Sequence, residues 1–521
     1  MGNRPAEKRI LAILLVVVAA SAVIRVSGVW FSYPLAVHPD EGRLVRPALK
    51  MIRTGNLNPQ FFHYPSLNIY LQAAMYKTVA LVEKTVHGGG MGRIPTIRFY
   101  ICGRVLNVVL SILTIVITFA IGRRLIHPIA GLAAACFVGA SSLHILNSFT
   151  ITVDAPMAFW SSLAVLMAAR IATGNRRLHD YVLAGLFVGL AVGSKYTAFL
   201  CVFPIVIAHL RGSREAKAWL TWPFLLCLVI IPFSFLLTTP YAALDYPAFF
   251  EAINSESSHY RSGHFGNEGE GTTSFVLYAK SLILEGLGPI PAALAAVGFV
   301  WLLRRNPWNA LLLLSFPLLL FLFVGQYKVF FSRNVVGAVP CLAVLGGAGV
   351  QLLYETVHHL WFRWRGTLRL AGSVAGGTVV LIVVLGTNGQ VGIAREEIRK
   401  LTLPDSRWVS LQWIVKNIPA GTSIGRERYT PPVQVFADRY RVTNLGFFSL
   451  TREKAVSKIP ALDYVVLSSY NFERFLEDPE YYPREAATYE AFFREQRLMR
   501  EFVPDDISLG GPRILIFAIE Q

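Results

Sequence analysis

Long apolar stretches recur along most of this sequence, and short polar segments separate them. A helix needs about 20 apolar residues to cross the hydrocarbon core of a membrane, and most of the stretches approach that length. The fifth and sixth are shorter, and we expect a tight hairpin whose turn, Ser194-Lys195-Tyr196, lies inside the membrane. The eleven candidate spans are Ile10–Phe31, Phe99–Ile121, Pro128–Ile145, Ala155–Ala172, Tyr181–Gly193, Thr197–Leu210, Trp219–Leu237, Gly288–Leu303, Ala310–Gly325, Val335–Leu353 and Leu370–Leu385.

Basic residues fall in short clusters between these spans. The net charge is +17, but clusters at span ends indicate the positive-inside pattern of membrane proteins and argue against a nucleic-acid partner. Alternating the spans places every cluster on one side, which predicts a multi-pass protein of the inner (cytoplasmic) membrane with a cytoplasmic N-terminus. The clusters are Arg4/Lys8/Arg9, Arg123/Arg124, Arg176/Arg177, Arg211/Arg214/Lys217, Arg304/Arg305 and Arg363/Arg365/Arg369.

The chain divides into two predicted domains. Residues 1–386 form a transmembrane domain whose first outer loop, 32–98, has apolar residues at helical spacing over 40–53 and 67–86. These two segments are typical of amphipathic helices on a membrane surface. Residues 387–521 are more charged and predict an extracytoplasmic α/β domain. Its expected helices are 406–417 and 484–502, and its expected strands are 422–425, 463–468 and 514–519.

Three carboxylates stand at the outer ends of predicted spans. Asp40 and Glu41 follow the first span, and Asp154 precedes the fourth. Ionisable groups at a membrane boundary are candidates for function because burying them is costly. We therefore take Asp40, Asp154 and Glu41 as candidate catalytic residues. The alternatives are that Asp40 and Asp154 only cap the helices that follow them and that Glu41 is a first-turn acid.

Cationic and aromatic residues fall on the same predicted side. Lys195 lies at the hairpin turn, and Arg333 lies between the ninth and tenth spans. The outer loop 238–273 adds further candidates, and Tyr64 lies between the two surface helices. Each also has a plain structural reading, as a snorkelling lysine, an anchor, a solvated loop residue or a packing residue. The candidate phosphate-binding residues are Lys195, Arg261, Arg333, Tyr64 and His259, with Tyr260 and His264 beside them.

Acids and cations at one membrane interface suit sugar transfer from a polyprenyl phosphate. The lipid tail requires the membrane, and the phosphate requires cations at the headgroup level. A carboxylate such as Asp40 can take the proton of an attacking hydroxyl, while Lys and Arg stabilise charge on the departing phosphate. One base and one displacement predict inversion at the anomeric carbon, whereas a retaining route would need Asp154 as nucleophile.

The quoted segments carry a resemblance to a known superfamily. The sequence resembles the protein O-mannosyltransferases and aminoarabinose transferases, polytopic glycosyltransferases of the GT-C fold that use polyprenyl-phosphate sugars. The resemblance extends from Asp40 to Pro431. The matching segments are His38-Pro39-Asp40-Glu41, Phe62-His63-Tyr64-Pro65-Ser66-Leu67, Thr152-Val153-Asp154-Ala155-Pro156-Met157, Gly189-Leu190-Ala191-Val192-Gly193-Ser194-Lys195-Tyr196, Asn417-Ile418-Pro419-Ala420-Gly421 and Tyr429-Thr430-Pro431.

The resemblance implies that Asp40 is the essential acid, that Asp154 assists it and that Lys195 contacts the donor phosphate. It also implies an undecaprenyl- or dolichyl-phosphate sugar donor. Three departures limit it: Tyr64 stands where the aminoarabinose transferases have a lysine, Pro65-Ser66 stands where the second motif has a double proline, and Ser332-Arg333-Asn334-Val335 fits the Arg-Tyr segment only loosely. A lipid A acceptor is therefore not implied, and a protein acceptor is not implied either, because the inserted luminal domain of the mannosyltransferases is missing.

Two other classes of function remain open at this stage. One is a transporter or flippase of polyprenyl lipids, and the other is a non-catalytic subunit that presents lipid-linked sugar to an enzyme. No required cofactor is expected and no metal site is assigned, although Asp40, Glu41 and Asp154 could ligate Mg²⁺ or Mn²⁺. The sequence leaves the sugar and the glycan, lipid or protein acceptor open.

Overall fold

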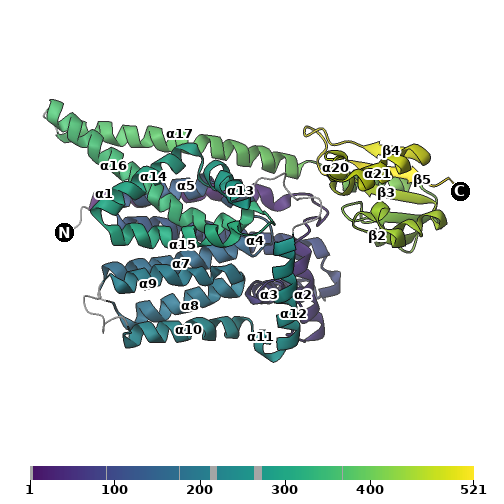
Figure 1. The fold of residues 1–521 in the computed structure, drawn as a ribbon, viewed down its shortest axis with the longest axis horizontal. Helices are drawn as coiled ribbons and strands as arrows, with labels where there is room; N and C mark the ends of the chain where they lie inside the picture. The colour runs from purple at the N-terminus through teal and green to yellow at the C-terminus, as the bar shows by residue number, and fades with distance from the viewer. Residues whose placement is uncertain are drawn as a thin grey trace. The chain divides into compact units, whose positions relative to one another are not determined.

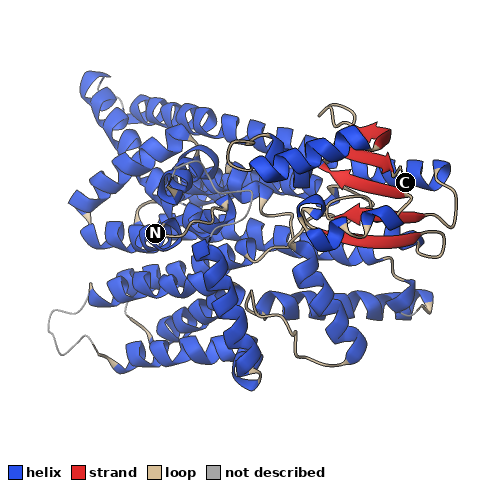
Figure 2. Ribbon diagram, turned by 45° about the vertical axis from the view of Figure 1, so that its right-hand side comes forward, coloured by secondary structure: helices blue, strands red, loops and turns tan. Residues whose placement is uncertain are grey.

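A computed structural model gives the fold for residues 4–89, 91–174, 176–211, 220–262, 273–365 and 368–520. The chain forms two compact units. The larger is helical and contains most of the residues before Glu397. The smaller holds a β-sheet and consists mainly of Glu397–Gln521 together with Trp30–Val37. Figure 2 shows the strands confined to the second unit.

The helical unit is built from long apolar helices that lie alongside one another (Figure 1). Its buried residues are largely Ala, Val, Leu, Ile and Phe, and they form one continuous core. Close helix packing is favoured where small residues such as Gly122 and Gly131 meet, because a Cβ on Gly122 would lie 2.8 Å from the Cα of Gly131. The elements are α1 (Arg4–Ser27), η1 (Gly28–Trp30), α2 (Glu41–Thr54), α3 (Leu67–His87), η2 (Met91–Arg93), α4 (Thr96–Leu125), α5 (Pro128–Ala140), α6 (Ser142–Leu146), α7 (Asp154–Thr173), α8 (Leu178–Ser194), η3 (Tyr196–Cys201), α9 (Val202–Leu210), α10 (Trp222–Thr238), α11 (Tyr241–Leu244), α12 (Tyr246–Ser262), α13 (Ser274–Ser281), η5 (Leu282–Leu287), α14 (Pro289–Arg305), α15 (Pro307–Gly325), η6 (Ser332–Ala338), α16 (Val339–Arg365) and α17 (Leu368–Thr402).

A helix covers each of the eleven predicted spans, which confirms a polytopic helical membrane protein. Within the described residues, six helices are long and apolar enough to cross a membrane, and a seventh results if the pair α13–η5 and α14, bent by 103°, is one span. Four further apolar helices, α5, α8, η3–α9 and α10, have 10–17 residues each. The exact count of eleven spans is therefore not confirmed.

Two segments differ from the sequence prediction. The outer loop 238–273 contains the helices α11 and α12, and α12 runs for 17 residues. Helix α12 was not predicted because its Glu, Ser, Asn and His residues interrupt the continuous apolar runs that indicate a membrane span. The last predicted span, Leu370–Leu385, is part of the 35-residue helix α17, which continues as a charged helix to Thr402.

The two predicted surface helices are present as α2 and α3, and they pack against each other. The apolar faces of Leu44, Val45 and Ala48 on α2 and of Ile69 and Tyr76 on α3 form a separate buried cluster. Gly55 ends α2 in the left-handed conformation, with a φ of 72° that favours glycine. This cluster holds the beginning of α2, and therefore Asp40, in a fixed position.

Arg25 is fully buried on α1, a feature that the sequence prediction missed. Its guanidinium donates to the carbonyl oxygens of Gly139 at 3.0 Å and Val138 at 3.3 Å, in the last turn of α5. It also donates to the Ser111 hydroxyl at 2.9 Å and contacts Nδ1 of His144 at 3.0 Å. Carbonyls at a helix C-terminus carry partial negative charge, so Arg25 caps α5 and joins it to α1.

The second unit contains a five-stranded sheet of order β2-β1-β3-β5-β4. The strands are β1 (Ser423–Glu427), β2 (Arg441–Gly446), β3 (Tyr464–Ser468), β4 (Arg497–Phe502) and β5 (Ile514–Ala518). Strands β2, β1 and β3 are parallel, while β5 is antiparallel to both β3 and β4. Helices of this unit are α18 (Ser406–Asn417), α19 (Glu453–Val456), α20 (Ser469–Leu476) and α21 (Pro483–Glu495), with short 3₁₀ turns η7 (Val433–Phe436), η8 (Ser449–Thr451) and η9 (Ile459–Ala461).

The predicted C-terminal α/β domain is confirmed, with two local corrections. The segment 484–502, predicted as one helix, contains helix α21 and then strand β4. The chain leaves the helix at Gln496 because Arg497–Phe502 pairs with β5, a tertiary contact that local sequence does not reveal. Strand β2 was not predicted, since its residues Arg441, Thr443 and Asn444 give it little apolar pattern.

Candidate active site

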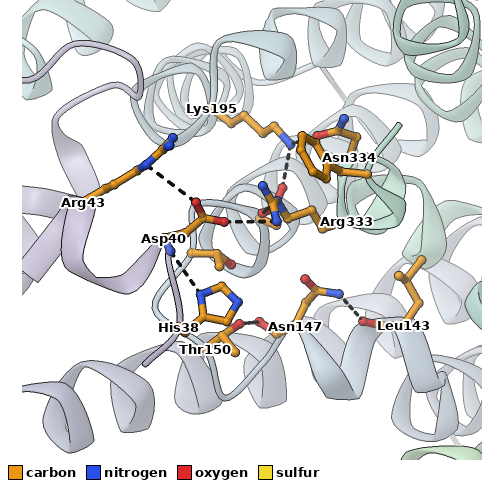
Figure 3. A network of polar contacts seen from close by, with 12 residues as sticks. His38, Asp40, Arg43, Leu143, Asn147, Thr150, Lys195, Arg333 and Asn334 are labelled. Carbon is orange, nitrogen blue, oxygen red and sulfur yellow. Dashed lines mark hydrogen bonds and ion pairs between the residues drawn. The ribbon is translucent and has the colours of Figure 1, made fainter. Parts of the chain in front are cut away.

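Four segments bring polar residues to one end of the helical unit. Asp40 immediately precedes α2, and Asp154 is the first residue of α7. Lys195 lies at the turn between α8 and η3, as predicted, and Arg333 lies in η6 just before α16. Figure 3 shows three of these side chains, Asp40, Lys195 and Arg333, in one polar network.

The guanidinium of Arg333 joins the two candidate acids. Its Nη1 lies 3.1 Å from Oδ2 of Asp40, and its Nε lies 3.8 Å from Oδ2 of Asp154. The ring of Phe331 lies below the guanidinium, with 4.4 Å between Cζ and the ring centroid. Asp40 and Asp154 therefore share one cation, and both lie within the reach that a common reaction centre requires.

Lys195 forms the second cationic contact of this network. Its Nζ donates to Oδ1 of Asp154 at 2.6 Å and to Oδ1 of Asn334 at 2.8 Å. Asn334 in turn donates to the Tyr278 hydroxyl at 2.9 Å. The Asp154 side chain is only 1% exposed, so its charge depends on Lys195 and Arg333 for compensation.

The helix-capping alternative does not account for either acid. Asp40 occupies the N-cap position of α2, but its side chain makes no capping hydrogen bond. It instead faces Arg333 and, at 3.8 Å, Arg43. Asp154 is not the N-cap of α7, because Val153 holds that position. Both carboxylates are therefore oriented by cations and not by helix ends.

Two further side chains border Asp40. Nδ1 of His38 accepts a hydrogen bond from the Asp40 backbone N–H at 3.3 Å (Figure 3). Burial lowers the pKa of His38, against the opposing effect of Glu41 and Asp40, which keeps its imidazole neutral. Burial and the negative charge of Asp40 raise the pKa of Tyr64 to about 12. Tyr64 therefore presents a neutral hydroxyl beside the charged network.

Glu41 pairs with a different cation, Arg104. Its carboxylate is fully buried and accepts two parallel hydrogen bonds from Arg104 on α4, each 2.8 Å long. It also accepts the Ile151 backbone N–H at 3.2 Å, while Arg104 donates to the Val29 carbonyl at 2.8 Å. This arrangement occupies the carboxylate and joins α2, α4 and the segment before α7. The geometry gives Glu41 a structural role, in contrast to the catalytic role predicted for it.

Two of the candidate phosphate-binding residues, His259 and Arg261, lie in the last turn of α12. Arg261 is exposed, and no ion pair joins it to a carboxylate within the described residues. His259 contacts the ring of Tyr260, with 6.0 Å between ring centroids. The residue of α12 that contacts the polar network is Tyr260, whose hydroxyl forms a hydrogen bond with the Asn334 side chain. His264 lies outside the residues that the structure describes.

A contact between a histidine and a glutamate fixes α12 against the first outer loop. Nδ1 of His63 lies 3.1 Å from Oε2 of Glu256, one helical turn before Tyr260. Asn58 also donates to Asp245 at 2.7 Å, just before α12 begins. These contacts position Tyr260 over the polar network. Sequence reasoning assigned no role to Asn334 or Glu256, although Asn334 directly follows Arg333.

The possible set of three metal-binding acids does not assemble. Glu41 is engaged by Arg104, and the Arg333 guanidinium lies between Asp40 and Asp154. Within the described part of the chain, no group of three or more His, Cys, Asp or Glu side chains is placed to hold a metal ion. The residues present do not fit a divalent ion in this arrangement, in which a guanidinium supplies the positive charge between the two acids.

The fold belongs to a known class of membrane protein, the GT-C glycosyltransferase fold. The structure of ArnT from Cupriavidus metallidurans matches with a TM-score of 0.58 over 96% of this chain and 97% of that chain, at 14% identity. ArnT bound to undecaprenyl phosphate matches with a TM-score of 0.53 over 99% and 98%. The archaeal oligosaccharyltransferase AglB from Archaeoglobus fulgidus, in complex with an inhibitory peptide and a dolichol-phosphate, matches at 0.57 with 12% identity, over 98% of this chain and 74% of that one.

The sequence itself also carries a family match. Residues 101–238 match the family model described as dolichyl-phosphate-mannose-protein mannosyltransferase. This segment contains Asp154 and Lys195 but neither Asp40 nor Arg333. Comparison with curated proteins gives no significant match. The resemblance stated from the sequence is thus confirmed by the fold and by this family match.

Proposed function

We propose that this chain is a membrane glycosyltransferase that moves a sugar from a polyprenyl-phosphate donor to an acceptor hydroxyl. The observation that carries the proposal is that Arg333 lies between two carboxylates, Asp40 and Asp154, with Lys195 beside them. Acids that can accept a proton and cations that can bind a phosphate thus meet at the end of a membrane-spanning helical unit. The fold and the family match are those of enzymes with such donors.

Arg333 and Lys195 bind the donor phosphate in this proposal. Both cations are partly accessible, with 25% and 12% of their side chains exposed, whereas Asp154 is buried behind them. Asp154 therefore acts as a positioning residue that holds both cations. When a phosphate binds, Arg333 exchanges its contact with Asp40 for the phosphate oxygens, and the Asp40 carboxylate becomes available as a base.

The reaction then proceeds by one displacement. Asp40 accepts the proton of the acceptor hydroxyl, whose oxygen forms a bond to the anomeric carbon of the sugar. The bond from that carbon to the phosphate oxygen breaks, and the electron pair leaves with the polyprenyl phosphate. Arg333 and Lys195 stabilise the added negative charge. A single displacement inverts the anomeric configuration, and the proposal requires no metal.

We further propose that the site faces the outside of the inner membrane. Figure 1 places the N-terminus of α1 and the helices α2, α3 and α12 at opposite ends of the helical unit. Arg123 of one basic cluster pairs with Glu7 of α1 at 2.9 Å, at the end that holds the N-terminus, and the positive-inside rule assigns that end to the cytoplasm. A cysteine introduced at Leu244, which is 75% exposed on α11, should react with an impermeant maleimide in intact cells. A cysteine at Arg305 should react only after permeabilisation.

The test of the transfer reaction uses purified protein in liposomes. A panel of undecaprenyl-phosphate sugars, each with a radiolabelled sugar, is offered together with an extracytoplasmic glycan and glycolipid fraction as acceptor. The wild-type protein should transfer label from at least one donor, with an inverted anomeric centre in the product. Asp40→Asn should lower the rate by roughly 10²–10⁴-fold.

A matched variant and a chelator complete this test. Asp245→Asn removes an acid near the same end of the unit but keeps an oxygen that can accept from Asn58, so it should retain the wild-type rate. The rate should also be unchanged in excess EDTA. Transfer by Asp40→Asn at the wild-type rate, or no transfer from any donor by the wild type, would refute the proposal. Loss of activity in EDTA would refute its metal-free form.

A further inference from the structure

The sheet unit carries a polar and aromatic cluster that the proposed reaction does not use. The parallel strands β1, β2 and β3 end at Glu427, Gly446 and Ser468, and their carboxyl ends lie at the same edge of the sheet. We call the residues that follow them the strand-end patch. Its members are Arg428, Tyr429, Phe447, Tyr470 and Asn471.

The strand order makes this edge a candidate for ligand binding. Strand β1 lies between β2 and β3, so the chain that leaves β1 turns to one side and the chain that enters β3 arrives on the other. Connections that diverge in this way define a topological switch point at the carboxyl ends of β1 and β3. Open α/β sheets bind their ligands at such switch points. Tyr429 follows β1 and Tyr470 follows β3, so both residues lie at this switch point.

The buried carboxylate of Glu427 fixes the three loops that form the patch. Its Oε1 accepts from the Ser449 backbone N–H at 2.9 Å, the Ser449 hydroxyl at 2.7 Å and the Tyr489 hydroxyl at 2.8 Å. Its Oε2 accepts from Nδ2 of Asn471 at 3.3 Å. The loops after β1, β2 and β3 are thereby held together, which is the rigid support that a binding site needs.

Two aromatic residues of these loops adopt a strained backbone. Tyr429 has a φ of 65° and Phe448 has a φ of 50°, in the left-handed region that bulky side chains rarely adopt. Such strain is found at ligand-binding and catalytic sites, where surrounding contacts enforce it. In addition, the buried side-chain oxygens Oγ of Ser468 and Oδ1 of Asn471 have no hydrogen-bond partner.

The side chains of the patch define the chemistry of its ligand. The Tyr429 ring contacts the rings of Phe447 and Tyr470, with 5.5 and 5.7 Å between centroids, and Tyr470 is 48% exposed. These rings offer a platform for the apolar face of a sugar. The Arg428 guanidinium lies over Phe447, 4.3 Å from the ring centroid, and forms no ion pair with any carboxylate in the described residues. Arg428 is exposed and places its positive charge beside these rings.

From this juxtaposition we propose that the strand-end patch binds a glycan that carries a carboxylate or phosphate group. The sugar ring stacks on Tyr429 and Tyr470, and the anionic group binds Arg428. This inference rests on the proposed function, since a glycosyltransferase that acts on glycans would use such a site to hold its acceptor. The sequence lacks the Gly-rich motif of nucleotide-binding loops in this domain, which favours a glycan over a nucleotide.

The experiment measures binding to the full-length protein in nanodiscs. The probe is hexagalacturonic acid, and its fully methyl-esterified form is the uncharged comparison. The wild-type protein should bind the acid form about tenfold more tightly than the ester. Arg428→Gln should weaken binding of the acid form about tenfold and leave the ester unaffected. Tyr470→Ala should weaken both forms, because the ring serves the sugar and not its charge.

Matched variants separate this site from general effects. Arg441→Gln removes an exposed arginine at the opposite edge of the sheet, and Tyr481→Ala removes an exposed tyrosine outside the patch; neither should alter binding. The inference would be overturned if the wild type did not bind hexagalacturonic acid at about 5 mM. It would also be overturned if the wild type, Arg428→Gln and Tyr470→Ala bound the acid equally well. Asp40→Asn should lower the transfer rate by roughly 10²–10⁴-fold and leave binding of the probe intact. If the wild type transfers sugar but does not bind the acid probe, this inference fails and the proposed function stands. If the wild type binds the probe but transfers no sugar, the proposed function fails and the binding site stands.

Discussion

Arg333 and Asp40 form an ion pair, with 3.1 Å between Nη1 and Oδ2, although they belong to the last and the first parts of the helical unit. The same guanidinium reaches Asp154 at 3.8 Å. One arginine thus balances two acids that come from different helices. An incoming phosphate would compete with Asp40 for this guanidinium. Donor binding would therefore make the Asp40 carboxylate available as a base.

The first prediction concerns Arg333. Arg333→Gln should lower the transfer rate by roughly 10²–10³-fold, because the charge that develops on the leaving phosphate loses a cation at close range. Arg333→Lys should recover only part of this loss, since an ammonium group cannot contact two acids through a planar fork. The measurement is the rate of sugar transfer at saturating and at limiting donor.

Arg305→Gln is the control for this prediction. The exposed Arg305 belongs to one of the predicted cytoplasmic clusters and pairs with Glu355 at 2.8 Å, and its loss should leave transfer unchanged. If Arg333→Gln transferred sugar as fast as Arg305→Gln, Arg333 would have no part in binding the phosphate.

The second prediction concerns Lys195 and Asp154, which are 2.6 Å apart. Lys195→Met should raise the KM for the donor, and Asp154→Asn should do the same, because Asp154 acts by holding the lysine. Groups that act as one unit have non-additive effects. The double variant should therefore bind donor about as weakly as the weaker single variant. Effects that multiply would show that the two residues act independently.

The pattern of apolar and ionisable residues along the sequence was sufficient to predict the main features of the fold and of the candidate site. Apolar runs located the long apolar helices of the transmembrane domain, and apolar spacing located α2 and α3. Asp40, Asp154, Lys195 and Arg333 were identified because each is an ionisable residue at the same predicted end of an apolar span. Helix ends on one side of a membrane must lie at one level, so sidedness along the sequence became proximity in space.

What the sequence did not reveal depends on contacts between distant segments. Nothing near Glu41 indicates that Arg104 engages it, and nothing near Arg25 indicates that the C-terminus of α5 compensates its charge. Helix α12 was missed because polar residues cover it, and its place is set by the His63–Glu256 pair. Strand β4 was missed because its pairing with β5 overrides a helical local sequence.

The third prediction concerns the pair Glu41 and Arg104, both of which are fully buried. Arg104→Met should destabilise the protein by about 3–5 kcal/mol, because it leaves the Glu41 carboxylate buried without a cation. Glu41→Gln should destabilise it for the converse reason. The double variant Glu41→Gln with Arg104→Met should be more stable than either single variant. Thermal unfolding in detergent measures this, and a double variant as unstable as the sum of both would contradict the structural role of the pair.

The fourth prediction concerns the pH dependence of the sheet unit. Burial raises the pKa of Glu427 above its ordinary value, although hydrogen bonds from Ser449 and Tyr489 oppose the shift. The folded state therefore holds this proton more tightly than the unfolded state. The resulting stabilisation is complete below the pKa of the unfolded chain, about 4.3, and is lost as the pH rises through the folded pKa.

Hydrogen exchange of the amides in β1 and β3, corrected for the intrinsic rate at each pH, measures this effect. The opening free energy of the wild type should fall as the pH rises above about 4.3, and Glu427→Gln should remove most of that fall because its amide does not titrate. Glu490→Gln, at an exposed position on α21, should behave as the wild type. If Glu427→Gln and Glu490→Gln kept the same pH dependence, the proton on Glu427 would not be coupled to folding of the sheet. The three loops that form the strand-end patch would then owe their rigidity to contacts other than this carboxylate.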